Sequence, residues 1–175
     1  MVHLAPIVID NSRSVEQTAK RLATLTPGFS GSDIASICNE AAILAARKDR
    51  EGVKPIDFEM AVERVIGGME VIKTVSQEER EIVAVHESGH AVVSWFLAGG
   101  DPLLKLTIIP RSKGSLGFAQ YLPNETSLER EDHIYDKICK ILGGRVAEEE
   151  FFGRITTGAY DDLNKAFQYA RAQVS

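Results

Sequence analysis

The sequence predicts a mainly α fold with one small β-hairpin. Apolar residues recur at helical spacing along most of the 175 residues, and 44% hydrophobic with 26% charged residues predicts a packed core. Residues 103–109 and 116–122 have the composition of strands, and the segment 110–115 between them is typical of a turn. The length allows one ordinary domain or two small ones.

Residues 1–68 predict a small helical unit. Residues 1–13 are short, irregular and mostly apolar, which fits a docked arm or the remnant of a strand. Helices are expected at 14–25, from Ser30 to a stop near Gly52, and from Pro55 to Gly67-Gly68. Basic residues crowd the expected end of the second helix, where the helix dipole favours cations, namely Arg47, Lys48 and Arg50.

Residues 69–175 predict a second unit built around one central helix. The expected elements are a linker at 69–75, the central helix at 76–98, the hairpin, a helix at 129–151 and a last helix from about 159. Ser76 and Glu79 form a capping-box pattern at the start of the central helix, and Thr126 to Glu129 repeats it. Gly143 and Gly144 predict close packing of their helix against another backbone.

The central helix carries the motif H-E-x-x-H at residues 86–90. Positions four apart share one helix face, so His86 and His90 can direct two imidazoles at one Zn²⁺. Glu87 can reach a water at the metal and serve as general base. The flanks are strongly apolar, and the alternative is a buried helix whose two histidines are satisfied by backbone carbonyls. Gly89 favours the metal site because it leaves room beside the ligands.

A third ligand is needed, since a catalytic zinc normally has three protein ligands and a water. The longer pattern H-E-x-x-H-x-x-G-x-x-H is absent, because Val93 and Phe96 occupy the later positions. The residues alone leave several candidates open, namely Glu148, Glu149, Glu150, Asp161, Asp162 and His133. A glutamate of the 148–150 run could instead orient a ligand histidine through its other ring nitrogen.

The hairpin allows two roles. It could simply cover the metal helix, or the edge at 118–122 could dock an extended polypeptide through backbone pairing, which we favour.

Composition excludes some classes of function. A net charge of −5 and an isoelectric point near 5.4 argue against nucleic-acid binding. Cys38 and Cys139 are expected to be reduced core residues, which indicates a reducing compartment. No apolar run approaches the roughly 20 residues of a membrane span, and no targeting peptide is visible. We expect the chain to be a fragment of a longer protein.

The first unit resembles the C-terminal helical lid of an AAA-type ATPase. The matching residues are Thr26-Pro27-Gly28-Phe29-Ser30-Gly31-Ser32-Asp33-Ile34 and Asn39-Glu40-Ala41-Ala42. In that family the region of Gly31 and Ser32 lies beside bound nucleotide, which suits a helix N-terminus. The phosphate-binding pattern G-x-x-x-x-G-K-[ST] is absent from the sequence, so ATP with Mg²⁺ is expected only in the full-length protein.

Residues 69–175 resemble the peptidase domain of the FtsH class of membrane-bound, ATP-dependent zinc proteases, peptidase family M41. The matching motifs are His86–His90, Ile109-Pro110-Arg111, Leu116-Gly117, Gly143–Glu149 and Thr156–Leu163. The resemblance implies an α-helical, zincin-like domain that lacks its last helices, with Asp162 as third ligand. It places Glu148 and Glu149 among the residues that orient a ligand.

The resemblance also implies a setting. Such proteins form homo- or hetero-hexameric rings that cleave unfolded polypeptides for quality control. Residues 101–105, 118–123 and 151–158 look most like the paraplegin-like m-AAA branch, which implies the mitochondrial inner membrane with the peptidase facing the matrix; a bacterial or plastid membrane is the alternative. Membrane attachment would come only from segments missing here. The alternative functions are a catalytically silent support subunit of such a ring and an isolated lid or adaptor.

Overall fold

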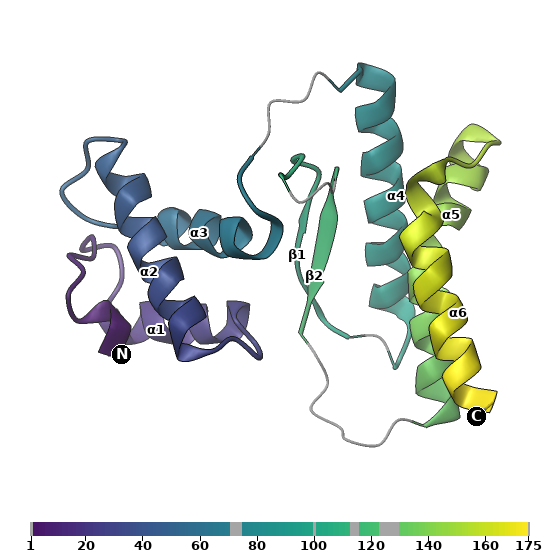
Figure 1. Ribbon diagram of the computed structural model, residues 1–175, viewed down its shortest axis with the longest axis horizontal. Helices are drawn as coiled ribbons and strands as arrows, with labels where there is room; N and C mark the ends of the chain where they lie inside the picture. The colour runs from purple at the N-terminus through teal and green to yellow at the C-terminus, as the bar shows by residue number, and fades with distance from the viewer. Residues whose placement is uncertain (1, 71–74, 100, 113–115, 123–129, 175) are drawn as a thin grey trace. The chain divides into compact units, whose positions relative to one another are not determined.

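The structure is a computed structural model that describes residues 2–70, 75–99, 101–112, 116–122 and 130–174. Contacts divide it into two units (Figure 1). The first holds the described residues up to Glu70 together with Arg111 and Ser112, and the second holds the other described residues. Six α-helices and a two-stranded antiparallel sheet make up the described part, which confirms the mainly helical prediction. No helix in the described ranges is long and apolar enough to cross a membrane.

The first unit is a small helical bundle. Its elements are the 3-10 turn η1 (Val2–Leu4) and the helices α1 (Val15–Leu25), α2 (Gly31–Ala46) and α3 (Pro55–Gly67). Ser14 and Ser30 each accept a hydrogen bond from a backbone N–H of the first turn, which fixes where α1 and α2 begin. Leu4 is buried with Leu22, Ile37 and Phe58 in the core of this unit, and Ile9 makes a single parallel bridge with Val53, so this segment shows features of both expected alternatives, a docked arm and the remnant of a strand.

The expected stop of the second helix near Gly52 is wrong, because α2 ends at Ala46. Asp49 has a positive φ of 49°, which a continuing helix does not allow. The basic residues bind a side chain instead of the helix end: Nη1 of Arg50 lies 2.8 Å from Oδ2 of Asp57, which is fully buried in α3. Ion pairing to Asp57 therefore decides the path of the chain here.

The second unit comprises α4 (Gln77–Phe96), β1 (Leu103–Thr107), β2 (Phe118–Tyr121), α5 (Glu131–Phe152), the 3-10 turn η2 (Thr157–Ala159) and α6 (Tyr160–Val174). The predicted capping box is confirmed: the Glu79 amide donates to Oγ of Ser76 (3.1 Å), and the Ser76 amide donates to the Glu79 carboxylate (2.9 Å). The second capping signal falls at 126–129, outside the described residues.

Helices α4 and α5 cross at close range. A Cβ added to Gly143 would lie 2.8 Å from the carbonyl oxygen of Gly89, closer than real Cβ contacts. The predicted close packing of Gly143 is therefore confirmed. The strongly apolar flank of the motif is not buried in its C-terminal half, since Trp95 and Phe96 are 77% and 81% exposed. Only the face with His86, Glu87, His90 and Ser94 is buried.

The hairpin is confirmed, with shorter strands than expected. Thr107 pairs with Phe118 and Leu103 with Tyr121, and β1 ends two residues before Ile109. The amide of Ile109 donates to the Thr107 hydroxyl (3.2 Å), which bends the chain out of the ladder. Arg111 and Ser112 then belong to the first unit, where Arg111 pairs with Glu63 and the Ser112 amide donates to the carbonyl of Met69 (2.8 Å).

Candidate metal centre

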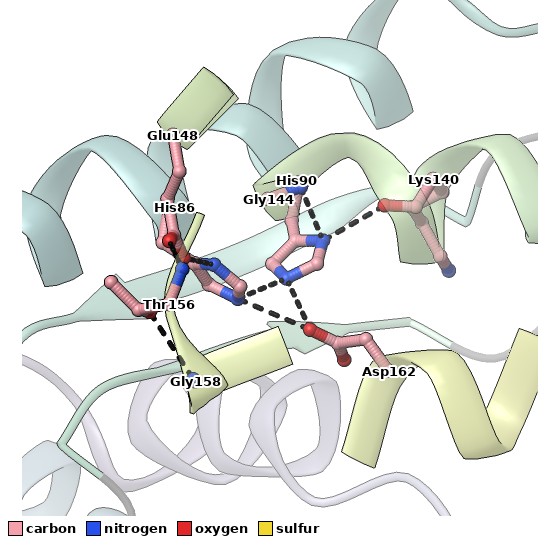
Figure 2. A network of polar contacts seen from close by, with 8 residues as sticks. All are labelled: His86, His90, Lys140, Gly144, Glu148, Thr156, Gly158 and Asp162. Atoms are coloured by element: carbon pink, nitrogen blue, oxygen red, sulfur yellow. Dashed lines mark hydrogen bonds and ion pairs between the residues drawn. The ribbon is translucent and has the colours of Figure 1, made fainter. Parts of the chain in front are cut away.

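Two histidines of α4 and one aspartate of α6 converge on one point. The Nε2 atoms of His86 and His90 lie 3.0 Å apart, and Oδ2 of Asp162 lies 3.1 Å from the first and 3.2 Å from the second. Figure 2 shows the two rings and the carboxylate directed toward one another. Each residue offers one possible ligand atom, so together they could hold a metal ion.

The spacing of these atoms fits zinc. Ligands arranged tetrahedrally at about 2.0–2.1 Å from Zn²⁺ lie about 3.3 Å from one another. The three observed separations, 3.0 to 3.2 Å, are close to that value. Two imidazoles and a carboxylate are also donors that zinc accepts.

Glycine at position 144 provides the space beside the ring nitrogens. A Cβ added to Gly144 would lie 2.6 Å from Nε2 of His90 and 2.7 Å from Nε2 of His86. Any side chain at this point of α5 would press on both nitrogens. Gly144 is thus closely packed as expected, but against the two imidazoles of the motif rather than against another backbone.

Each histidine is held through its other ring nitrogen. Nδ1 of His86 donates to Oε1 of Glu148 (2.6 Å), and Nδ1 of His90 donates to the backbone carbonyl of Lys140 (2.8 Å). We assign the protons to Nδ1 because Oε1 of Glu148 and the Lys140 carbonyl can only accept; the Gly144 amide also lies 3.3 Å from Nδ1 of His90, but the contact to the Lys140 carbonyl is shorter. This tautomer leaves the Nε2 atoms free to bind a metal.

Glu148 also anchors the segment that leads to Asp162. It is 1% exposed, and its second carboxylate oxygen accepts a hydrogen bond from the amide of Thr156 (2.7 Å). The Thr156 hydroxyl in turn accepts from the amide of Gly158 (3.2 Å), which starts the turn η2 before α6. One buried carboxylate thus links His86 to the loop that positions Asp162.

The ion pairs shift two pKa values in the metal-free site. Burial alone would lower the pKa of His86, but hydrogen bonds to Asp162 and Glu148 outweigh it and raise the pKa. Burial alone would raise the pKa of Asp162, but the hydrogen bonds with His86 and His90 hold it well below its usual range. Asp162 is therefore a carboxylate over the whole neutral range, as a metal ligand must be.

Glu87 has a different environment from the other acids. It is 9% exposed, and its carboxylate forms no hydrogen bond with any residue in the described ranges. Burial raises the pKa of its carboxyl, and the nearby histidines His90 and His86 offset part of that rise. A carboxylate with no hydrogen bond and a raised pKa suits a group that accepts and returns a proton.

The three converging side chains open onto a cleft of about 720 Å³. Helix α4 lines the cleft with Glu87, and strand β2 with Tyr121, next to Gly117 just before the strand. Helix α6 contributes Asp162 and Lys165. A cleft of this size accommodates several residues of an extended peptide.

The other sequence candidates lie elsewhere. Glu149 and Glu150 are exposed on α5, Asp161 is exposed next to Asp162, and His133 lies against Gly99 near the start of α5. Gly31 and Ser32 belong to the first unit, exposed at the first turn of α2.

Sequence reasoning gave no role to Lys140, Thr156 or Gly117. Lys140 acts through its carbonyl and Thr156 through its amide, and neither group leaves a side-chain signal in a sequence. Gly117 lies against Glu87; its signals in the sequence were a glycine inside the expected strand 116–122 and its place in the motif Leu116-Gly117.

Comparison with known proteins agrees with this geometry. A sequence model of peptidase family M41 matches residues 73–175, and a model of the AAA+ lid domain matches residues 18–60. The chain is 55% identical to the mitochondrial inner membrane m-AAA protease components AFG3L2 and AFG3L1 of Mus musculus, over 99% of its own length and 22% of theirs. It is 49% identical to the ATP-dependent zinc metalloprotease FtsH of Rhodothermus marinus, over 99% of its length and 24% of that protein. The chain thus spans about a fifth to a quarter of the relatives it matches.

Proposed function

The chain belongs to peptidase family M41, and on that premise we propose that its second unit is the peptide-cleaving part of a zinc metalloendopeptidase. The observation that carries the proposal is the convergence of His86, His90 and Asp162 beside Glu87, on an open cleft. Nδ1 hydrogen bonds that free both Nε2 atoms support it further.

In the proposed reaction His86, His90 and Asp162 hold the metal. When bound, zinc would supply a Lewis acid for the scissile carbonyl and the attacking water. Glu87 takes the proton from that water and passes it to the leaving amine. Glu148 and the Lys140 carbonyl keep the imidazoles in the tautomer that this arrangement needs.

Strand β2 is proposed to align the substrate. In the described part of the chain β2 pairs with β1 and with no other strand, and Phe118, Ala119 and Tyr121 line the cleft. An extended peptide that pairs with β2 would pass the metal ligands with little dependence on its sequence. Proline replacements across 118–122 should slow peptide cleavage; unchanged cleavage would count against this role.

The wider setting is also proposed. The lid match and the names of the relatives support a chain that works within a longer, ATP-dependent protease complex. From the family resemblance we propose further that this complex is a ring of six in which Gly31 and Ser32 lie beside nucleotide. Unfolded and membrane polypeptides are the proposed substrates. The mitochondrial inner membrane, with the peptidase facing the matrix, is the proposed location, since two relatives carry that membrane in their names.

The test replaces Glu87 with Gln in the whole protein that contains this chain. Zinc content should stay at one ion per chain while cleavage of a denatured protein falls at least 100-fold. Glu149→Gln is the matched control, because Glu149 is an exposed carboxylate outside the site, and it should cleave normally. Retained cleavage by Glu87→Gln would refute the assignment, and a wild-type protein that binds zinc without cleaving would favour a support subunit.

A further inference from the structure

Gly117, the residue before strand β2, approaches the Glu87 side chain closely. A Cβ added to Gly117 would lie 3.0 Å from both Cγ and Oε1 of Glu87, tighter than nearly all real Cβ contacts. It would also lie 2.8 Å from the carbonyl oxygen of Thr107 on β1. The Gly117 backbone therefore lies in close contact with the Glu87 side chain.

This contact matters because the carboxylate is attracted by nearby positive groups but is not fixed by a hydrogen bond from the described residues. Glu87 has no hydrogen-bond partner among the described residues, whereas Asp162 and Glu148 each have at least two polar partners. A glutamate side chain has several staggered rotamers of similar energy. Contact with Gly117 restricts which of them the side chain can occupy.

The strand itself cannot yield easily at this point. Thr107 pairs with Phe118, the residue after Gly117, so the backbones on both sides of the added methyl belong to the hairpin ladder. The Glu87 side chain, in contrast, turns about single bonds. A methyl at position 117 would press on both the Thr107 carbonyl oxygen (2.8 Å) and the Glu87 side chain (3.0 Å). The hairpin can relieve the first contact only by a shift of its backbone, whereas Glu87 relieves the second by turning its carboxylate away.

We propose that Gly117 is a positioning residue for Glu87: its missing side chain lets β2 approach and hold the carboxylate in the orientation needed for proton transfer. The proposal rests on the function proposed above. An ordinary contact begins near 3.4 Å, so an alanine must displace the carboxylate by at least about 0.4 Å (3.4 − 3.0). Catalytic groups need placement within about 0.5 Å, and errors near 1 Å can cost about 100-fold in rate.

The first test measures cleavage kinetics of Gly117→Ala in the whole protein that contains this chain. We expect kcat to fall about 10- to 100-fold, with KM within about threefold and one zinc per chain retained. Gly99→Ala is the control, because its added Cβ would lie 2.8 Å from a carboxylate oxygen of Asp136, away from the cleft. An unchanged kcat, a rise in KM alone, or a loss of zinc equal to the loss of rate would overturn the proposal.

The second test needs no activity and is a double-mutant cycle on thermal unfolding. Gly117→Ala should lower the melting temperature of the wild type more than that of Glu87→Ala, which has neither Cγ nor carboxylate to clash. If Gly117→Ala lowers the melting temperature equally in the wild type and in Glu87→Ala, the added methyl clashes with Thr107 alone, and the proposal is overturned. This cycle gives its answer even if the wild-type protein cleaves nothing, in which case the proposed function fails on its own.

Discussion

Replacing Gly144 with alanine is the sharpest perturbation of the metal centre. The added methyl would lie 2.6 Å from Nε2 of His90 and 2.7 Å from Nε2 of His86, against an ordinary minimum near 3.4 Å. One or both rings must therefore retreat by up to about 0.8 Å (3.4 − 2.6). Their Nδ1 bonds to Glu148 and Lys140 resist such a movement.

The expected cost in zinc affinity follows from these distances. Zinc–ligand distances in working sites stay within about 0.2 Å of ideal values. The ring displacement expected here, up to about 0.8 Å, is several times larger than that. Loss of one hydrogen bond that orients a ligand histidine already costs typically 10- to 100-fold in metal affinity, and this displacement should cost at least as much. We therefore expect Gly144→Ala to weaken zinc binding at least about 100-fold.

The assay is a competition titration of folded protein against a chromophoric zinc chelator, with circular dichroism as the check on folding. Gly143→Ala serves as the comparison, because the atoms nearest to its added Cβ belong to the Gly89 backbone and the Val93 side chain, whereas those nearest to the Cβ of Gly144→Ala belong to the imidazoles. It should lose stability with a much smaller loss of zinc affinity. If folded Gly144→Ala binds zinc as tightly as the wild type, the metal does not lie between these nitrogens.

Three further predictions concern stability and metal binding. Glu148→Ala should weaken zinc binding about 10- to 100-fold, measured by the same titration, because it frees His86 and the Thr156 loop together. The melting temperature of the metal-free protein should be highest between about pH 4 and 6.5. Above this range the stabilisation by protonated His86 is lost, because the pH rises through the raised pKa of His86. Below it the stabilisation by ionised Asp162 is lost, because the pH falls toward the lowered pKa of Asp162. A melting temperature that rises steadily to pH 8 without metal would contradict this pairing. Arg50→Met should lower the free energy of unfolding of the first unit by about 2 kcal/mol, measured with urea. The loss should be smaller than for a fully buried ion pair, because Lys48 remains 3.7 Å from Asp57. An unchanged urea midpoint would show that Lys48 alone is enough to pair with the Asp57 carboxylate.

The local signals of the sequence were sufficient where one short segment decides the structure. The spacing of His86 and His90 places them on one helix face whatever surrounds them, and Ser76 with Glu79 starts that helix through hydrogen bonds within one turn. Gly143 and Gly144 also gave a usable signal, because paired glycines inside a helix cost stability unless another backbone comes close.

Signals failed where distant contacts decide. Nothing in the 148–150 run distinguishes Glu148 from its neighbours, because burial depends on which side of α5 faces α4 and the Thr156 loop. Separating Asp162 from Asp161 required the family resemblance, since both occupy the first turn of α6. The stop of α2 was misplaced because Asp57, in the next helix, draws Arg50 away from the helix end.

The central claim is that His86, His90 and Asp162 surround one zinc ion. Crystals of the protein grown with zinc, measured on both sides of the zinc absorption edge, test it most directly. We expect a single anomalous peak about 2.0–2.1 Å from the two Nε2 atoms and a carboxylate oxygen of Asp162. A peak bound by other residues, or an Asp162 side chain turned away from an occupied site, would contradict it.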